Sequence, residues 1–248
     1  MNFIGIIPAR YASTRFPGKP LVMINGKMMI QRVFEQASKV FDHVVVATDD
    51  KRIFEAVEGF GGKVVMTSKK HRSGTDRCAE AVSIYESDYD IEFDVVVNIQ
   101  GDEPFIYPEQ LKEVAACFKN KKVQIATLAK PINNSEDIFN PNKPKVIVNK
   151  KQDAIYFSRS PIPYVRDEKQ EKWVKYRFYK HIGLYAYRKD VLHKITRLDA
   201  TPLEIAESLE QLRWIENGYK IKVEFTEYES ISIDTKADLK KVDTIGLM

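Results

Sequence analysis

The sequence predicts an α/β fold in which helices flank a mixed, mainly parallel sheet. Short apolar runs of strand length alternate along the chain with segments whose apolar residues recur at helical spacing. A strand, a helix and a second strand in succession form a right-handed crossover, which makes the two strands parallel. The 248 residues, of which 44% are apolar, suffice to bury a core as one large domain or two small ones.

The expected elements follow one another along the chain. We expect strands at 3–7, 43–48, 63–67, 94–100, 123–129, 146–148, 154–157, 181–187, 221–225 and 231–233. We expect helices through 30–41, 53–57, 78–85, 111–118 and 202–213, and a last helix that begins at Asp234.

Charge and composition argue against several classes of protein. With 39 basic and 35 acidic residues the net charge is only +4, and no aromatic-basic array accompanies the basic loops, which argues against nucleic-acid binding. No apolar run approaches the roughly 20 residues that cross a bilayer, and the N-terminus lacks a signal-peptide pattern, so we expect a cytoplasmic protein. Cys78 and Cys117 are expected to be buried thiols, neither bridged nor bound to zinc.

The loop that follows the first strand is basic. The apolar run breaks at Pro8, and Arg10, Arg15 and Lys19 then lie within ten positions. A loop at the carboxyl end of a buried parallel strand lies where open α/β sheets bind ligands, and Gly18 allows the backbone to come close to one. We expect this loop to bind a polyphosphate, the alternative being solvated surface charge. Its spacing matches neither a P-loop nor a Rossmann glycine motif.

Two helix starts carry polar residues. The acids at 49–50 could ligate a metal, but capping the next helix explains them with fewer assumptions. At 71–77, Ser73 and Gly74 offer a hydroxyl and backbone donors to a base or phosphate, with Arg77 one turn into the helix. Taken alone, this second segment is only a good N-cap sequence.

The most apolar strand, 94–100, should be central. It delivers Gln100 and the turn Gly-Asp-Glu-Pro to the carboxyl edge of the sheet. Asp102 is well placed there to hold Mg²⁺ against phosphate oxygens, since this ion usually takes one or two carboxylates and completes its shell with substrate oxygens and water. A simple turn is the alternative.

The pattern changes between residues 131 and 187. A strand hairpin and an irregular proline-containing run indicate an insertion. We therefore divide the chain into a nucleotide-binding core at 1–130, an inserted subdomain at 131–187 and a C-terminal return to the core at 188–248.

The helix at 202–213 has two faces. Ile205, Leu209, Leu212 and Ile215 are expected to face inward. The opposite stripe, which could simply be solvated, consists of Glu207, Glu210, Gln211 and Trp214. Asp234 begins the last helix and could be only an N-cap, because Thr235 and Asp238 resemble a capping box.

Six segments together resemble the 3-deoxy-manno-octulosonate cytidylyltransferases, a family of sugar nucleotidyltransferases also called CMP-KDO synthetases. They are IPARYASTRFPGKPL at 7–21, SGT at 73–75, QGDEP at 100–104, FSR at 157–159, LEQLR at 209–213 and IDT at 233–235. The resemblance covers nearly the whole chain and is weakest at 167–179. It implies a Rossmann-like (GT-A-like) nucleotidyltransferase fold and transfer of CMP from CTP to 3-deoxy-D-manno-octulosonate (KDO). The products would be CMP-KDO, used in lipopolysaccharide biosynthesis, and pyrophosphate.

The resemblance also implies roles for individual residues, with Mg²⁺ as cofactor and a homodimer as the assembly. It implies that the insertion at 131–187 carries the sugar acceptor site and part of a dimer contact. The implied nucleotide-binding residues are Pro8, Ala9, Arg10, Arg15, Lys19, Ser73, Gly74 and Arg77. The implied metal ligands are Asp102 and Asp234, which join Arg10 and Lys19 as catalytic residues. The implied sugar-binding residues are Gln100, Arg159, Arg166, His181, Tyr185, Glu210 and Gln211. Arg159 is expected to meet the sugar carboxylate, for which a planar guanidinium is better suited than an ammonium.

Three alternatives remain at this point. The acceptor could be another sugar acid such as N-acetylneuraminate, although enzymes for that sugar tend to have asparagine where Pro20 follows Lys19. The chain could instead be a nucleotide-binding module without catalysis, or a weak RNA binder whose affinity falls steeply with salt.

Overall fold

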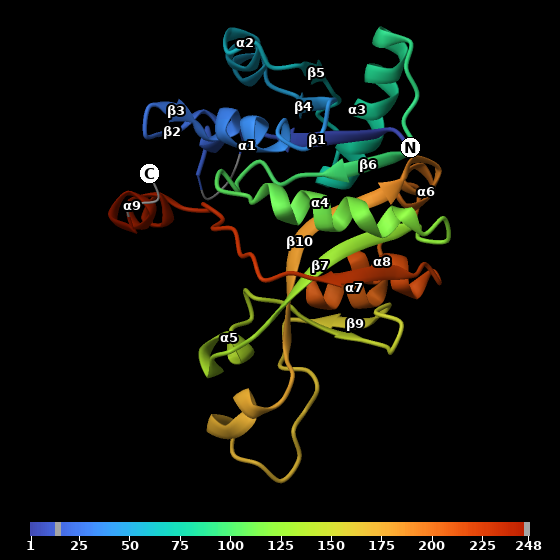
Figure 1. Ribbon diagram of the computed structural model, residues 1–248. Helices are drawn as coiled ribbons and strands as arrows, with labels where there is room; N and C mark the ends of the chain where they lie inside the picture. Colours follow the sequence, from blue (N-terminus) through green and yellow to red (C-terminus); the bar gives the residue numbers. More distant parts are fainter. Residues whose placement is uncertain (13–15, 246–248) are drawn as a thin grey trace. The chain divides into compact units, whose positions relative to one another are not determined.

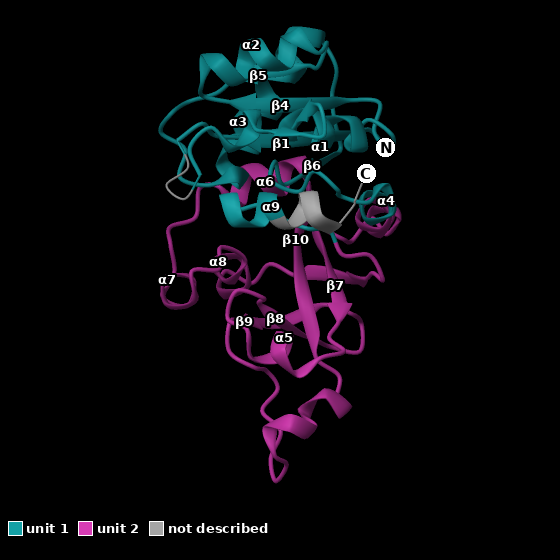
Figure 2. Cartoon of the chain, turned by 90° about the vertical axis from the view of Figure 1, so that its left-hand side faces the viewer, with its two compact units in different colours: residues 1–112, 230–248 teal, residues 113–229 magenta. Residues whose placement is uncertain are grey.

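The computed structural model describes residues 1–12 and 16–245, and the chain forms two compact units. The first consists of Met1–Lys112 and Ser230–Met248, and the second of Glu113–Glu229 (Figure 2). The boundaries expected from the sequence, at 130 and 187, both fall inside the second unit. The C-terminal return to the first unit begins at Ser230 rather than at residue 188.

The first unit contains four parallel strands, as predicted. Their order is β6 (Val95–Asn98), β1 (Phe3–Ala9), β4 (Val44–Thr48) and β5 (Val64–Met66) (Figure 1). Side chains of β1, β4 and β6 are almost entirely buried, which explains why these segments read as continuous apolar runs rather than alternating ones.

Two helices of the first unit, α2 and α3, begin where the sequence places capping residues. Asp50 caps α2 (Lys51–Gly59) by accepting from the Arg52 amide, and Ser73 caps α3 (Gly74–Tyr89) in a capping box with Asp76. The unit also contains η1 (Lys19–Leu21), the strand pair β2 (Met23–Ile24) and β3 (Lys27–Met28), α1 (Met29–Ala37) and α9 (Lys236–Ile245). Helix α4 (Pro108–Ala116) contains the unit boundary.

The second unit is built on β7 (Ile125–Pro131). It pairs antiparallel with β10 (Tyr179–Arg188) and parallel with β11 (Ile221–Phe225). The predicted hairpin is present as β8 (Lys145–Val148) and β9 (Ala154–Ser158). The remaining elements are short helices: η2 (Cys117–Lys119), α5 (Ser135–Phe139), η3 (Gln170–Lys175), α6 (Lys189–Ile195), α7 (Pro202–Glu207) and α8 (Gln211–Glu216).

Two elements differ from the prediction. The single helix expected at 202–213 is broken at Ser208, whose φ of 51° is left-handed, so the inward face changes between α7 and α8. Ile205 is consequently 69% exposed, whereas Gln211 and Trp214, expected on the outer stripe, are buried. The strand expected at 231–233 is not regular structure.

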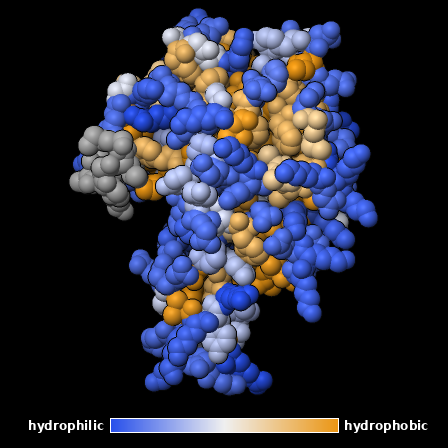
Figure 3. Space-filling model, in the orientation of Figure 1, coloured by the Kyte–Doolittle hydropathy of each residue, from blue (hydrophilic) through white to orange (hydrophobic). Residues whose placement is uncertain are grey.

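The surface drawn in Figure 3 is predominantly hydrophilic, with smaller hydrophobic patches between the polar residues. Within the described residues, no helix combines the length and the apolar character needed to span a membrane. Both cysteines are free thiols; Cys78 is buried, and Cys117 is only half-buried.

Candidate active site

The basic loop after β1 is folded back on itself. The Gly18 amide donates to the Tyr11 carbonyl, and Gly18 adopts a φ of 73°. A Cβ at this position would lie 3.2 Å from the Tyr11 ring, so both the conformation and the close approach favour glycine. The turn places Lys19 at the start of η1, close to the carboxyl end of β1.

Two further glycines bring the other chain segments close to the end of β1. A Cβ on Gly101 would lie 2.9 Å from the Pro8 carbonyl oxygen, and one on Gly74 would lie 3.4 Å from the Pro8 ring. The turn after β6 and the N-terminus of α3 therefore approach the same strand end, as expected for the carboxyl edge of a parallel sheet.

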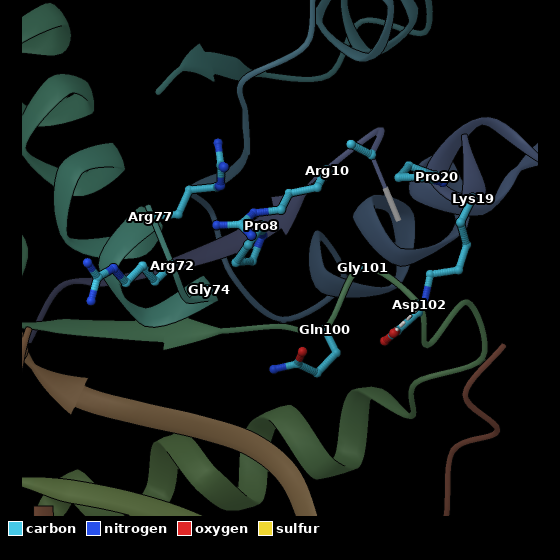
Figure 4. A pocket seen from close by; sticks show the side chains of 12 residues that line it. Pro8, Arg10, Lys19, Pro20, Arg72, Gly74, Arg77, Gln100, Gly101 and Asp102 are labelled. Atoms are coloured by element: carbon cyan, nitrogen blue, oxygen red, sulfur yellow. Dashed lines mark hydrogen bonds and ion pairs between the residues drawn. The ribbon is translucent and has the colours of Figure 1, made fainter. Parts of the chain in front are cut away.

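These three segments line a pocket of about 380 Å³ in the first unit (Figure 4). Its lining residues are Pro8, Ala9, Arg10, Ala12, Lys19, Pro20, Arg72, Gly74, Arg77, Gln100, Gly101 and Asp102. Four of these side chains are basic and one is acidic, so the pocket suits an anion.

One lysine joins the two predicted metal ligands. Lys19 Nζ lies 2.7 Å from Asp102 Oδ2 and 3.1 Å from Asp234 Oδ1, and all three side chains are largely shielded from solvent (Figure 4 draws Lys19 and Asp102). Two aspartates that are 132 positions apart in the sequence therefore meet at one positive charge.

Backbone and apolar contacts hold Asp234 in this position. The Ile233 amide donates to the Asp102 carbonyl at 2.9 Å, and the Ile233 side chain packs in a cluster with Ile24 and Met29. The capping box of α9 is formed by Thr235 and Asp238. Since Thr235 is the cap, the Asp234 carboxylate is available to face Lys19.

The two carboxylates fit a divalent cation. A single ammonium group already occupies the space between them, so positive charge is favoured there. Among the described residues, no group of three or more acidic, histidine or cysteine side chains forms a self-sufficient metal site. Mg²⁺ does not require such a group, because it is usually held by one or two carboxylates together with substrate phosphates.

The sequence predicts Arg77 as a nucleotide-binding residue one turn into α3, but its side chain lies in the protein interior. Its side chain is fully buried; Nη1 donates to Thr67 Oγ1 at 2.5 Å, and Nη2 lies 3.5 Å from Asp49 Oδ2. Burial lowers the pKa of this guanidinium, and the nearby Asp49 carboxylate opposes that shift. The paired acids thus have separate roles, because Asp50 caps α2 and Asp49 faces Arg77.

The structure brings most of the predicted nucleotide-site residues together. The pocket includes six of them, Pro8, Ala9, Arg10, Lys19, Gly74 and Arg77, together with Asp102, predicted as a metal ligand, and Gln100, predicted to bind the sugar. Arg10 donates to the His71 carbonyl, whereas the Ser73 hydroxyl caps α3. Arg15 lies outside the described residues.

Sequence reasoning missed Arg72, which lines the pocket from the loop before α3. A usable signal was present, since a basic residue immediately before a Ser-Gly-Thr helix start adds charge to an N-terminus that already favours anions.

The predicted sugar-binding arginines lie in the second unit and differ in environment. Arg159 donates to the carbonyl oxygens of Glu207, Pro141 and Ser208 at 2.6, 3.0 and 3.2 Å. Arg166 is 89% exposed and lies 4.0 Å from Asp167. Arg159 is therefore held in a defined place, while Arg166 is solvated.

His181 and Tyr185 lie in contact on β10, as predicted from their alternation. Their ring centroids are 5.3 Å apart, and the His181 ring also meets Phe157 edge to face. Burial lowers the pKa of His181 to about 3. Burial, with a smaller effect from Glu210, raises the pKa of Tyr185.

Glu210 and Gln211 lie at the start of α8, as its N-cap and its first residue. The Gln211 side chain is 5% exposed, and its Nε2 makes no hydrogen bond to any described residue. Glu210 lies 3.6 Å from Arg213. A buried amide donor without a partner is costly to leave unsatisfied, which favours a ligand or water at this position.

Comparison with known proteins identifies the family. A family model described as cytidylyltransferase matches residues 4–222. The 3-deoxy-manno-octulosonate cytidylyltransferase of Parabacteroides distasonis is 61% identical, covering 97% of this chain and 96% of the relative, and that of Bacteroides thetaiotaomicron is 59% identical, covering 98% and 97%.

A solved structure agrees with these relatives. CMP:2-keto-3-deoxy-manno-octonic acid synthetase complexed with CTP has a TM-score of 0.90 and 42% identity, with 99% of this chain and 98% of that chain covered. The matches span essentially the full length on both sides, so the chain belongs to the 3-deoxy-manno-octulosonate cytidylyltransferases, a family of nucleotidyltransferases.

Proposed function

We propose that this protein transfers CMP from CTP to KDO and releases pyrophosphate, a step of lipopolysaccharide biosynthesis. The observation that carries the proposal is the convergence of Lys19, Asp102 and Asp234 beside a basic pocket at the carboxyl edge of the parallel sheet. The high identity to relatives named for this reaction supports the choice of substrates.

The pocket residues would bind CTP through charge and backbone donors. Arg10, Lys19 and Arg72 offset the negative charge of the triphosphate, which otherwise repels an approaching oxygen nucleophile. Gly74, the first residue of α3, lines the same pocket, and the N-terminus of a helix favours anions. Most of the rate acceleration would come from positioning and electrostatics.

A divalent metal is normal for cytidylyltransferases that use CTP, and we propose that here it is Mg²⁺ held by Asp102 and Asp234. When bound, this ion offsets phosphate charge and polarises the phosphate oxygens as a Lewis acid. Lys19, which lies between the two carboxylates, would then be available to the triphosphate.

The sugar would bind to residues of the second unit, with Arg159, His181, Tyr185, Glu210 and Gln211 as candidates. The anomeric 2-hydroxyl oxygen of KDO attacks the α-phosphorus in line, so that a bond between this oxygen and phosphorus forms while the bond from the α-phosphorus to the bridging oxygen breaks and pyrophosphate leaves. The hydroxyl loses its proton to solvent in this step. With a pKa of about 3, His181 is too weak a base to be assigned that proton.

Pyrophosphate release with CTP, Mg²⁺ and a panel of sugar acids tests this proposal. We expect rapid release with KDO and at least a hundredfold lower kcat/KM with N-acetylneuraminate, since the acceptor site is built for one set of hydroxyls. Equal release with both sugars would overturn the choice of acceptor. Tight CTP binding without any release would indicate a binding module.

We further propose a homodimer and a cytoplasmic location. The second unit exposes large apolar side chains, with Ile155, Tyr164 and Tyr176 at 52%, 78% and 44%. Exposed aromatic residues of this kind are enriched in interfaces between proteins. Sedimentation should give twice the 28.6 kDa chain mass, and Tyr164→Asp should shift the equilibrium toward the monomer.

A further inference from the structure

The hydroxyl of Thr127, on β7, lies among several polar groups of β10, one of which is the Tyr185 side chain. Thr127 Oγ1 is 2.8 Å from the Leu184 carbonyl oxygen, 3.1 Å from the Ile182 carbonyl oxygen and 3.1 Å from His181 Nε2. Thr127 is fully buried, so this small network is shielded from water.

An irregularity of the sheet creates this arrangement. The register between β10 and β7 shifts between Ile182 and Tyr185, where Gly183 lies, and Tyr185 rather than Gly183 stands opposite Thr127. A β-bulge of this kind leaves part of the backbone out of the ladder and redirects side chains. Two carbonyl groups of β10 therefore reach the same hydroxyl.

Counting protons fixes the direction of each hydrogen bond. A threonine hydroxyl has one hydrogen to donate and lone pairs to accept, whereas the two carbonyl oxygens only accept. If that hydrogen pointed to His181, both carbonyl oxygens would face the hydroxyl oxygen without a proton between them. The hydroxyl therefore donates to a carbonyl, of which Leu184 is the nearer, and His181 Nε2 donates to Thr127.

The tautomer of His181 follows from this direction. A neutral imidazole carries one proton, so a proton on Nε2 leaves Nδ1 as a hydrogen-bond acceptor. Within the described residues Nδ1 makes no hydrogen bond, and the ring is only half-buried. The lowered pKa of His181 agrees with a neutral ring.

We propose that Thr127 is a positioning residue that holds His181 as the Nε2–H tautomer, so that Nδ1 accepts a hydrogen bond from a hydroxyl of the sugar substrate. This inference rests on the proposed function, because it takes the sugar to be the ligand that meets His181. In this tautomer, Nδ1 of His181 recognises a hydroxyl group that donates a hydrogen bond. Because the ring is neutral, His181 is excluded as a cationic partner of the sugar carboxylate.

The surroundings of the ring support a fixed, neutral role. Phe157 and Tyr185 contact it, and the titratable groups nearby are Tyr185 itself and Glu210, which acts on Tyr185. Burial raises the pKa of Tyr185, so this side chain stays uncharged at neutral pH.

Nitrogen-15 NMR of histidine-labelled full-length protein tests the tautomer without any substrate. The chain has four histidines, and the His181 signals are assigned by their loss in His181→Gln. We expect a protonated Nε2, an unprotonated Nδ1 and no titration between about pH 5 and 8. A protonated Nδ1, or titration near the ordinary histidine pKa, would overturn the inference whichever sugar is used.

Kinetics then test the link to the sugar. Thr127→Val keeps the shape but removes the hydroxyl; we expect mixed tautomers of His181 and KM for KDO raised about tenfold, with KM for CTP changed less than about twofold. Thr127→Ser restores the hydroxyl and should return both the spectrum and the KM for KDO. Thr226→Val is the matched control, since Thr226 is also buried in the same unit, and among the described residues its hydroxyl accepts from the Tyr228 amide and makes no hydrogen bond to His181.

The outcomes separate this inference from the proposed function. Loss of the tautomer in Thr127→Val without any change in KM for KDO would refute the contact between His181 and the sugar. A correct tautomer in a protein that releases no pyrophosphate with KDO would leave the positioning of His181 intact and refute the reaction.

Discussion

The candidate site of the first unit is lined by charged side chains at strand ends, whereas that of the second unit relies more on neutral groups. Lys19, Asp102 and Asp234 are 14%, 27% and 34% exposed, and they interact by charge. His181 and Gln211 of the second unit are half-buried or buried, and they interact by hydrogen-bond direction. Binding a triphosphate requires positive charge that offsets its negative charge. Binding sugar hydroxyls requires hydrogen-bond donors and acceptors in the correct orientation.

We expect the largest effect on activity from substitution of the two carboxylates in the first unit. Asp102→Asn or Asp234→Asn keeps the side-chain shape but halves the negative charge that faces Lys19. We expect kcat for pyrophosphate release to fall on the order of 10³-fold, because charge stabilisation in the transition state is lost. The circular dichroism spectrum should stay unchanged.

Asp190→Asn is the matched control for this pair. Asp190 lies on α6 with 65% exposure and forms an ion pair with Lys194 one helical turn away. It should retain full activity, since exposed pairs of this kind contribute little. Near-normal rates in either Asp102→Asn or Asp234→Asn would remove that residue from the metal site.

We expect the next largest effect on activity from the backbone turn at Gly101 in the first unit. In Gly101→Ala the new Cβ would lie 2.9 Å from the Pro8 carbonyl oxygen, so the turn that carries Asp102 must move away from β1. We expect kcat/KM to fall about 10- to 100-fold, since displacements near 1 Å reduce rates by that order.

Gly59→Ala serves as the comparison, because a Cβ at the end of α2 would meet nothing within 4 Å. It should preserve activity and raise stability by up to about 1 kcal/mol. Equal loss of activity in both variants would show that the close approach at Gly101 is unimportant.

The lowered pKa of His181, a half-buried residue of the second unit, predicts a pH dependence of stability. The folded pKa of His181 is about 3, below the ordinary value of 6.5, so between these values the unfolded chain binds more protons. The stability conferred by His181 is therefore fully present above pH 6.5 and declines as pH falls toward 3, by at most about 1.4 kcal/mol per pH unit.

Urea unfolding at several pH values measures this dependence. The acid side of the profile should be flatter in His181→Gln than in the unsubstituted protein. Parallel profiles from pH 6.5 downward would show that His181 is not held neutral by burial.

The smallest expected effect is at the rim of the pocket. Arg72 is exposed, so Arg72→Gln should raise KM for CTP only about three- to fivefold, and added salt should reduce the difference. Lys70→Gln, on the same loop but outside the pocket lining, should leave KM unchanged. An effect of equal size at Lys70 would indicate general charge attraction instead of a pocket contact.

The parts of the fold that local rules determine could be predicted from the sequence. The first strand, the cap at Ser73 and the turn at Gly101 each depend on residues close in the chain, although β1 continues through Pro8 to Ala9. They also supplied the nucleotide-site residues, because the carboxyl ends of parallel strands share one edge.

The remaining features depend on contacts that local patterns do not contain. Ser208 breaks a helix whose apolar period looked continuous, and Glu207 beside it binds Ser158 Oγ and the Arg159 amide. The contacts proposed to make Thr127 a positioning residue depend on the bulge in β10. The pattern of residues in β7 does not indicate that bulge.

The central claim is that Asp102 and Asp234 share one cation site. The most direct measurement is the anomalous scattering of Mn²⁺ in crystals of the full chain grown with CTP. We expect the ion within bonding distance of carboxylate oxygens from both Asp102 and Asp234, with Lys19 turned to the triphosphate. An ion held by the triphosphate alone, with Asp234 still paired to Lys19, would contradict the account.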